Sequence, residues 1–202
     1  MADKERILVL LGRVTRPGMD GLINYLETSD YFTAPGSSLH HDTVKGGLAT
    51  HCLKVYGNLV YLNDKFGTLN NDSVILCALL HDLCKVNLYK DNILKSGKQS
   101  TDKPYTSEDL LPLGHGEKSL YLIQKYIQLT DEEALCIRWH MGLYDKSLFA
   151  NDSKLQELCP NAYLLYFADH LSVLFPDDKG GSSLDLPEEK VSFIHLTSPK
   201  DI

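Results

Sequence analysis

The chain has 202 residues, a formal net charge of −7 and five cysteines. This length lets one domain bury a substantial core without disulfides or a structural metal, and an odd number of cysteines without a C-x-x-C pair fits a reducing compartment. The negative charge argues against nonspecific binding to long duplex nucleic acid, which depends on many lysine and arginine contacts to phosphate.

The N-terminal residues predict neither a targeting segment nor a membrane anchor. Residues 1–6 are mostly charged, and the apolar stretch at 7–11 is too short for the core of a signal peptide. No run of about eighteen apolar residues occurs in the chain, so we expect a cytoplasmic protein without a membrane partner. Helical spacing first becomes clear in the stripe of Met19, Leu22, Ile23 and Leu26.

A second helical stripe carries a histidine on its apolar face. His51 lies three residues after Leu48 and four before Val55, which places its side chain on the inward side of the helix. A lone histidine there is usually a hydrogen-bonded core residue, so His51 becomes informative only together with other ligand-type residues. The full stripe consists of Leu48, Cys52, Val55, Leu59 and Leu62.

An adjacent histidine and aspartate, His81 and Asp82, close an apolar run that begins at Val74. We expect this run to be a buried helix with Asp72 as its N-cap. Burial of the pair is costly because its apolar neighbours offer no hydrogen bonds, and either an internal hydrogen bond or a metal ion would offset the cost. If a metal is bound, imidazole nitrogen and carboxylate oxygen favour Mn, Fe, Ni, Co, Zn or Mg over a soft metal.

The helical periodicity stops between residues 86 and 112, where a glycine amid polar residues predicts a small hairpin or an ordered loop. We expect this insertion to overhang the site. Five lysines and two aspartates lie between Lys85 and Lys103, which is a local excess of positive charge. The excess favours an anionic substrate, although a solvated lysine-bearing loop explains it equally well.

Three further candidate ligands follow the insertion. His115 lies within a Gly-His-Gly sequence, and His140 ends a helix that begins with a capping box at Thr130. Asp169 faces inward on a last long helix, whose first turn we place at Pro160. A buried carboxylate without a partner nearby in the sequence requires one in space.

These residues resemble the signature of the HD-domain metal-dependent phosphohydrolase superfamily, which is a histidine, an adjacent His-Asp pair and a distant aspartate. Here those are His51, His81, Asp82 and Asp169. The similarity covers residues 31–173 and looks like the bacterial branch that includes the HD domains of exoribonucleases and many bacterial and phage hydrolases. The matching segments are Gly46–His51, Ala78–Lys85, Leu113–Lys118 and Ile137–Gly142.

The resemblance implies a site for two divalent ions, because superfamily members that keep the two additional histidines commonly hold two. By this carry-over, the first ion is held by His51, His81, Asp82 and Asp169. The second is held by Asp82, His115 and His140, so that Asp82 bridges the two ions. Cys84 follows the pair closely, but the resemblance assigns it no ligand role.

The resemblance also implies an all-α architecture, a single HD-domain helical bundle, for which we expect about seven helices and a small loop or hairpin insertion near the site. We place the HD domain at residues 1–176 and a polar, acidic tail at 177–202. Within the domain, we expect N-terminal helices in residues 1–30, a ligand-bearing core in 31–176 and the insertion at 86–112.

The implied reaction is hydrolysis of a phosphate ester by a metal-activated hydroxide. The implied substrate is small and phosphorylated: a nucleotide, a linear or cyclic dinucleotide, or a short single-stranded nucleic-acid end. We assign catalytic roles to Asp82, Lys85 and His41, and substrate contacts to Lys85, His40, His41 and Tyr89. Alternatives exist: Lys85 as an exposed lysine at a helix end, the two histidines as loop hydrogen-bonding groups, and Tyr89 as a packing residue.

Two other function classes stay open on the sequence alone. Di-iron members of the same superfamily use related ligands to activate oxygen, and iron content with oxygen consumption would identify such an oxygenase. A binding or regulatory module with a structural ion is the other possibility. The complete set of six candidate ligands argues against this last class.

Overall fold

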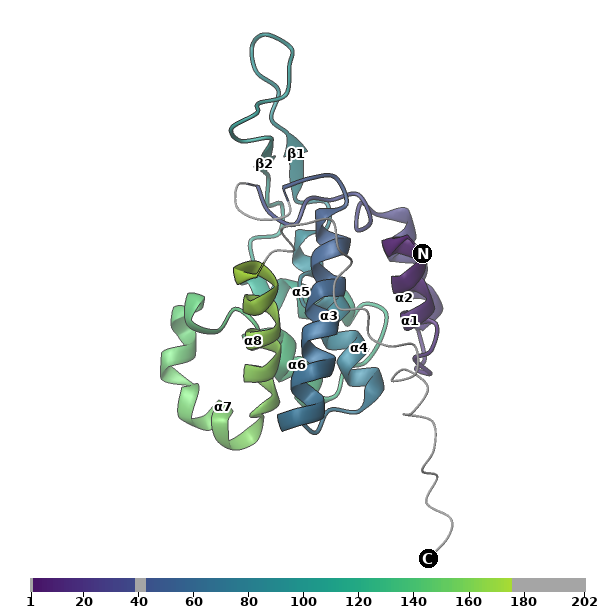
Figure 1. The fold of residues 1–202 in the computed structure, drawn as a ribbon, viewed down its shortest axis with the longest axis vertical. Helices are drawn as coiled ribbons and strands as arrows, with labels where there is room; N and C mark the ends of the chain where they lie inside the picture. The colour runs from purple at the N-terminus through teal and green to yellow at the C-terminus, as the bar shows by residue number, and fades with distance from the viewer. Residues whose placement is uncertain (1, 39–42, 176–202) are drawn as a thin grey trace, which may run out of the picture.

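The computed structural model describes residues 2–38 and 43–175. Within these residues the chain forms eight α-helices, three 3-10 helices and one two-stranded sheet (Figure 1), which confirms the predicted all-α bundle. The α-helices are α1 (Asp3–Leu11), α2 (Met19–Thr28), α3 (Gly47–Phe66), α4 (Asn71–Leu80), α5 (His115–Ile123), α6 (Asp131–Trp139), α7 (Asp152–Leu158) and α8 (Asn161–Leu174). The other elements are η1 (Leu83–Lys85), β1 (Tyr89–Asp91), β2 (Tyr105–Ser107), η2 (Gly142–Tyr144) and η3 (Lys146–Ala150).

The helix α4 lies at the centre of the bundle and is buried on every side. All residues from Ser73 to Leu80 are buried, because the run Val-Ile-Leu-Cys-Ala-Leu-Leu places apolar side chains all around the helix. Both α3 and α6 pack against α4, and α8 packs against α3 and α6 (Figure 1). A helix buried all round places the residues that follow it, His81 and Asp82, directly in the interior of the domain.

Two helix starts differ from the predicted positions. Asn70, rather than Asp72, is the N-cap of α4, and its side chain accepts a backbone N–H of the first turn at 2.9 Å. Asparagine and aspartate cap helices about equally well, so the residue type does not decide between neighbouring positions. Pro160 precedes α8 as its N-cap instead of lying in the first turn. The capping box of α6, formed by Thr130 and Glu133, is confirmed.

The insertion contains a hairpin that projects from one end of the bundle (Figure 1). Its strands β1 and β2 pair antiparallel, with Lys90 opposite Thr106. The hairpin extends away from the helices rather than across them, and Ile93 near its tip is 57% exposed. Its base reaches the site, because Tyr89 interacts electrostatically with Lys85 at the end of η1.

The N-terminal helices share the core of the bundle, since α1 packs against α2, α3 and α4. The division between a domain and an acidic tail stays a proposal, because residues 177–202 lie outside the described ranges. In the part of the chain that the structure describes, no helix combines the length and the apolar content needed to cross a membrane.

Candidate metal centre

The structure brings together all six side chains that the sequence analysis assigned as candidate metal ligands. Four of them stand at helix ends: His81 and Asp82 after α4, His115 at the start of α5 and His140 at the end of α6. The other two, His51 and Asp169, lie within α3 and α8.

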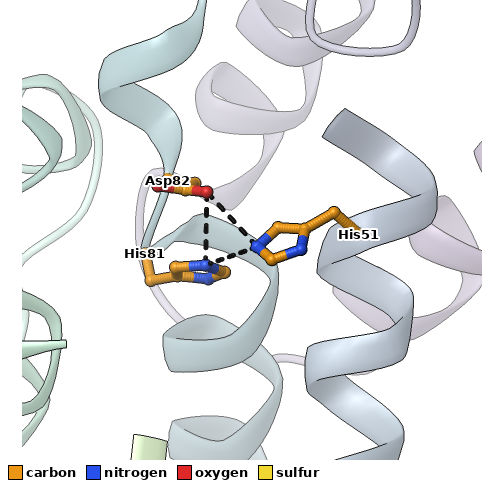
Figure 2. Close-up of side chains that lie close together, drawn as sticks. All are labelled: His51, His81 and Asp82. Carbon is orange, nitrogen blue, oxygen red and sulfur yellow. Dashed lines mark hydrogen bonds and ion pairs between the residues drawn. The ribbon is translucent and has the colours of Figure 1, made fainter. Parts of the chain in front are cut away.

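The first group of side chains surrounds the Nε2 atom of His51, as Figure 2 shows in part. This nitrogen lies 3.3 Å from His81 Nε2 and 3.4 Å from Asp82 Oδ2. It also lies 3.2 Å from Asp169 Oδ1. His51, His81 and Asp82 are buried, and each offers one ligand atom within 4.8 Å of the others, a spacing that allows one ion to contact all three.

The second group lies on the other oxygen of the same aspartate. Asp82 Oδ1 is 2.8 Å from His115 Nε2 and 3.6 Å from His140 Nε2. His140 is fully buried, yet its Nε2 atom has no hydrogen-bond partner among the described residues. An unsatisfied buried nitrogen is costly, and it is the arrangement expected of an imidazole that binds a cation.

Backbone carbonyls orient two of the imidazoles. His81 Nδ1 lies 2.9 Å from the carbonyl oxygen of Ala78, and His140 Nδ1 lies 2.7 Å from that of Ile137. A carbonyl oxygen only accepts hydrogen bonds, so each Nδ1 carries the proton and each Nε2 presents its lone pair to the cluster. The local helix geometry thus prepares both rings as Nε2 ligands.

A serine that the sequence analysis missed orients the third imidazole. Ser172 Oγ lies 3.2 Å from His51 Nδ1 and donates a hydrogen bond of 2.6 Å to the carbonyl of Asp169. Because the serine proton is used by that carbonyl, Oγ accepts from His51 Nδ1, and Nε2 again faces the cluster. The available signal was the spacing Asp-x-x-Ser, which places both residues on one face of α8.

Charge and hydrogen bonding keep the two carboxylates of the cluster ionised. Burial raises the pKa of Asp82, but the charge of Lys85, together with the hydrogen bond from His115, holds it well below its usual value. Burial also opposes ionisation of Asp169, but the hydrogen bond from His51 together with nearby positive charge outweighs burial, so the pKa of Asp169 is lowered. Two ionised carboxylates, one buried and one partly buried, attract a cation into this region.

The histidines of the first group differ in charge state. Burial lowers the pKa of His51, but hydrogen bonds to Asp169 and Asp82 outweigh burial and raise it to about 9. Burial dominates at His81, where the pKa is lowered and the imidazole is neutral. A metal ion at this position therefore has to displace a proton from His51 and none from His81.

Lys85 is a largely covered partner of Asp82 and not the exposed helix-end lysine that we considered as an alternative. Its side chain is 11% exposed, and Nζ lies 2.6 Å from Asp82 Oδ2. Burial lowers the pKa of Lys85, but the charge of Asp82 and the hydrogen bond to it together outweigh burial and raise the pKa. Lys90 pairs with Glu108, so two of the five lysines behind the predicted positive excess are already neutralised.

The remaining predicted substrate contacts are placed only in part. His40 and His41 lie outside the described residues, and their assignments stay proposals. Tyr89 is half-buried at the base of the hairpin, and burial raises its pKa.

Cys84 also comes within reach of Asp82 and His115, but burial and the charge of Asp82 raise the pKa of its thiol to about 12. A protonated thiol is a poor metal ligand.

The donor set fits a divalent ion of borderline or hard character. It consists of imidazole nitrogens and carboxylate oxygens, the groups that bind Mn, Fe, Ni, Co, Zn or Mg. The orphaned Nε2 of His140 and the oriented rings of the other histidines point to the same conclusion. The fold and the site together define a helical domain with an internal cluster of histidines and aspartates that can hold a divalent metal.

The comparison with protein families agrees with this class. The sequence model of the HD domain family matches residues 48–174, more than half of the chain, and the protein belongs to the HD domain family. Members of this family are generally metal-dependent phosphohydrolases, which supports metal-dependent hydrolysis as the class of activity. Searches among curated proteins and among solved structures gave no match.

Proposed function

We propose that this protein hydrolyses phosphate esters of a nucleotide, a linear or cyclic dinucleotide, or a short single-stranded nucleic-acid end. The observation that carries the proposal is the placement of Asp82, whose two oxygens face two separate groups of histidines. This placement supports two ions with one shared carboxylate. The first ion would bind His51, His81, Asp82 and Asp169, and the second Asp82, His115 and His140.

The residues around Asp82 would have different roles in such a reaction. A bound divalent ion lowers the pKa of water and neutralises charge on a phosphoryl oxygen. Lys85 holds a buried positive charge beside Asp82 Oδ2, where it would contact a nonbridging phosphate oxygen. We assign proton donation to the leaving group to His41, a phosphate contact to His40, and a substrate contact to Tyr89 at the hairpin base.

The experiment that tests this function is elemental analysis of gently purified protein, followed by hydrolysis assays with a generic phosphomonoester and a generic phosphodiester. Mn, Ni, Fe and Mg are added back separately. We expect Asp82→Asn to abolish hydrolysis and to lower metal content while circular dichroism stays that of a folded helical protein. Asp72→Asn, at the opposite end of α4, is the matched control and should change neither quantity.

Asp82→Asn leaves Lys85 without its carboxylate partner and could unfold the protein. A second variant therefore separates loss of activity from loss of the fold. His115 is 34% exposed, so His115→Ala should fold normally and still lose most of the activity. Bound iron with oxygen consumption and no hydrolysis would instead support the oxygenase class. A folded protein that binds no metal and hydrolyses neither ester would contradict the proposal.

A further inference from the structure

A cavity of about 260 Å³ opens directly beside the metal centre, at His115. Its wall is formed by the start of α5, the end of α6 and the segment that contains η2 and η3. The side chains that matter for its chemistry are His115, Arg138, Tyr144, Lys146 and Ser147. Because His115 lines it, this cavity adjoins the site on the His115 side.

The cavity lies on the side from which the metal centre is open. Among the six candidate ligands, His115 is 34% exposed and Asp169 is 20% exposed, whereas the other four are at most 3% exposed. The segment η2 lies near both of these residues, because Tyr144 lines the cavity beside His115 and its ring lies 6.0 Å from the ring of His170, the neighbour of Asp169. Tyr144 is therefore close to both of the more exposed candidate ligands.

The charges in the cavity wall balance one another. Arg138 donates to Glu117 and to Asp145, each over 2.6 Å, and its guanidinium lies 4.0 Å from the ring of Trp139. Its charge is therefore already paired inside the wall. Lys146 offsets the second carboxylate, so the wall has no net charge. Such a cavity suits an uncharged group better than a second phosphate.

The position of Tyr144 is held by the backbone of η2. Gly142 has a positive φ of 52°, and a Cβ there would collide with the ring of Tyr166 in α8. The backbone of η2 thus packs directly against α8, which limits its freedom to move. Tyr144 is 69% exposed on this support, so its ring is free to stack on a planar ligand group.

We infer that this cavity binds the group attached to the scissile phosphate, and that this group is an uncharged planar ring, such as a nucleobase, stacked on Tyr144. The inference rests on the proposed function and narrows its substrate class. Small-molecule pockets commonly measure about 300–1,000 Å³, so a smaller cavity accommodates one nucleoside and not a second nucleotide. Mononucleosides with one phosphate ester are therefore favoured over dinucleotides.

The test compares two substrates that differ only by the base, adenosine 5′-monophosphate and ribose 5-phosphate. Stacking of one base on an aromatic side chain contributes enough that its removal weakens binding by about 5- to 100-fold. We expect Tyr144→Ala to raise KM for the nucleotide by that factor, with little change in kcat, and to leave ribose 5-phosphate unaffected. Tyr144→Phe should behave like the unsubstituted protein.

The matched control is Tyr61→Ala, which removes a tyrosine of α3 that is 58% exposed and does not line the cavity. A second readout does not depend on hydrolysis: NMR titration of the metal-loaded protein with adenosine, which has no phosphate ester. Adenosine should perturb signals of η2, and Tyr144→Ala should weaken this binding.

The two readouts separate failure of the inference from failure of the proposed function. If the protein hydrolyses adenosine 5′-monophosphate and ribose 5-phosphate equally well, or if Tyr144→Ala and Tyr61→Ala act alike, the inferred base-binding cavity is contradicted. The proposed phosphohydrolase function is then unaffected. If no ester is hydrolysed but adenosine binds in a Tyr144-dependent manner, the function is overturned and the subsite stands. Absence of both hydrolysis and adenosine binding overturns both.

Discussion

Ser172 in α8 joins the orientation of His51 in α3 to the backbone of its own helix. Its Oγ accepts from His51 Nδ1 at 3.2 Å and donates to the carbonyl of Asp169 at 2.6 Å. One helix thus provides both the carboxylate of Asp169 and the group that aims a histidine of another helix. This bond links α3 and α8 at the centre of the site.

Substitution Ser172→Ala should weaken metal binding by about 10- to 100-fold, the usual effect of losing a partner that orients a ligand histidine. Competition titration with Mn²⁺ measures this directly. Ser172→Thr keeps the hydroxyl and should restore affinity. Ser73→Ala is the matched control, because Ser73 is equally buried and hydrogen-bonded but lies at the far end of α4. Equal losses in both alanine variants would show a merely structural role.

Metal affinity should rise with pH up to about 9, because the pKa of His51 is raised to about 9 and a metal ion must displace its proton. Below that pKa, affinity should increase by at most about tenfold per pH unit, and it should level off above it. Mn²⁺ titrations in two buffers of different ionisation enthalpy measure the released proton. Affinity that is independent of pH in this range would contradict the assignment of His51 as a ligand.

The same pKa shift has the opposite effect on the metal-free protein. A raised pKa stabilises the folded state fully below the ordinary value of 6.5, and this contribution disappears as the pH rises through about 9. Chelated protein should therefore lose stability between these pH values, whereas metal-loaded protein should not. Denaturant unfolding with and without chelator measures the difference. If the stability of chelated and metal-loaded protein depended on pH in the same way, the raised pKa of His51 would be contradicted.

Substitution His140→Ala should reduce the number of bound ions by one per chain and leave the first group occupied. The reason is that His140 approaches Asp82 Oδ1, whereas His51 and His81 approach Oδ2. Elemental analysis after equilibration with Mn²⁺ gives the stoichiometry. His170→Ala provides the control, since His170 stacks on Tyr166 outside both groups. Unchanged stoichiometry in His140→Ala would remove the basis for a second ion.

Stability in acid should depend on Glu133, which is fully buried and paired with Arg16 at 2.6 Å. Burial raises its pKa, but the hydrogen bonds from Arg16, Thr130 and Ser73 outweigh burial and lower it. A lowered pKa means that the stabilisation is present above about pH 4.5 and is lost as the pH falls through the folded-state value.

Breaking this pair with Glu133→Gln should lower the free energy of unfolding by about 3 kcal/mol at neutral pH and flatten its decline in acid. Urea unfolding at several pH values measures both effects. Glu157→Gln removes an exposed partner of Lys154 and should cost less than about 1 kcal/mol. A similar cost in both variants would mean that burial adds nothing to the Arg16–Glu133 pair.

Local patterns predicted the helices and the candidate ligands. The period of apolar residues placed His51 and Asp169 on inward faces, because the direction of a helical side chain depends only on its position along the helix. The His81-Asp82 pair stood out because two polar groups closed an apolar run. The family resemblance assigned His115 and His140 to a second ion, and the structure places all six side chains in one cluster.

Tertiary structure alone decided how those side chains meet. The partition of the Asp82 oxygens between two groups of histidines, its pairing with Lys85 and the orientation of His51 by Ser172 all join groups on separate segments or depend on a rotamer. Sequence spacing determines the face of a helix that a residue occupies. It does not determine which helices face each other or which rotamer is selected, because packing against every neighbour in the folded core sets both.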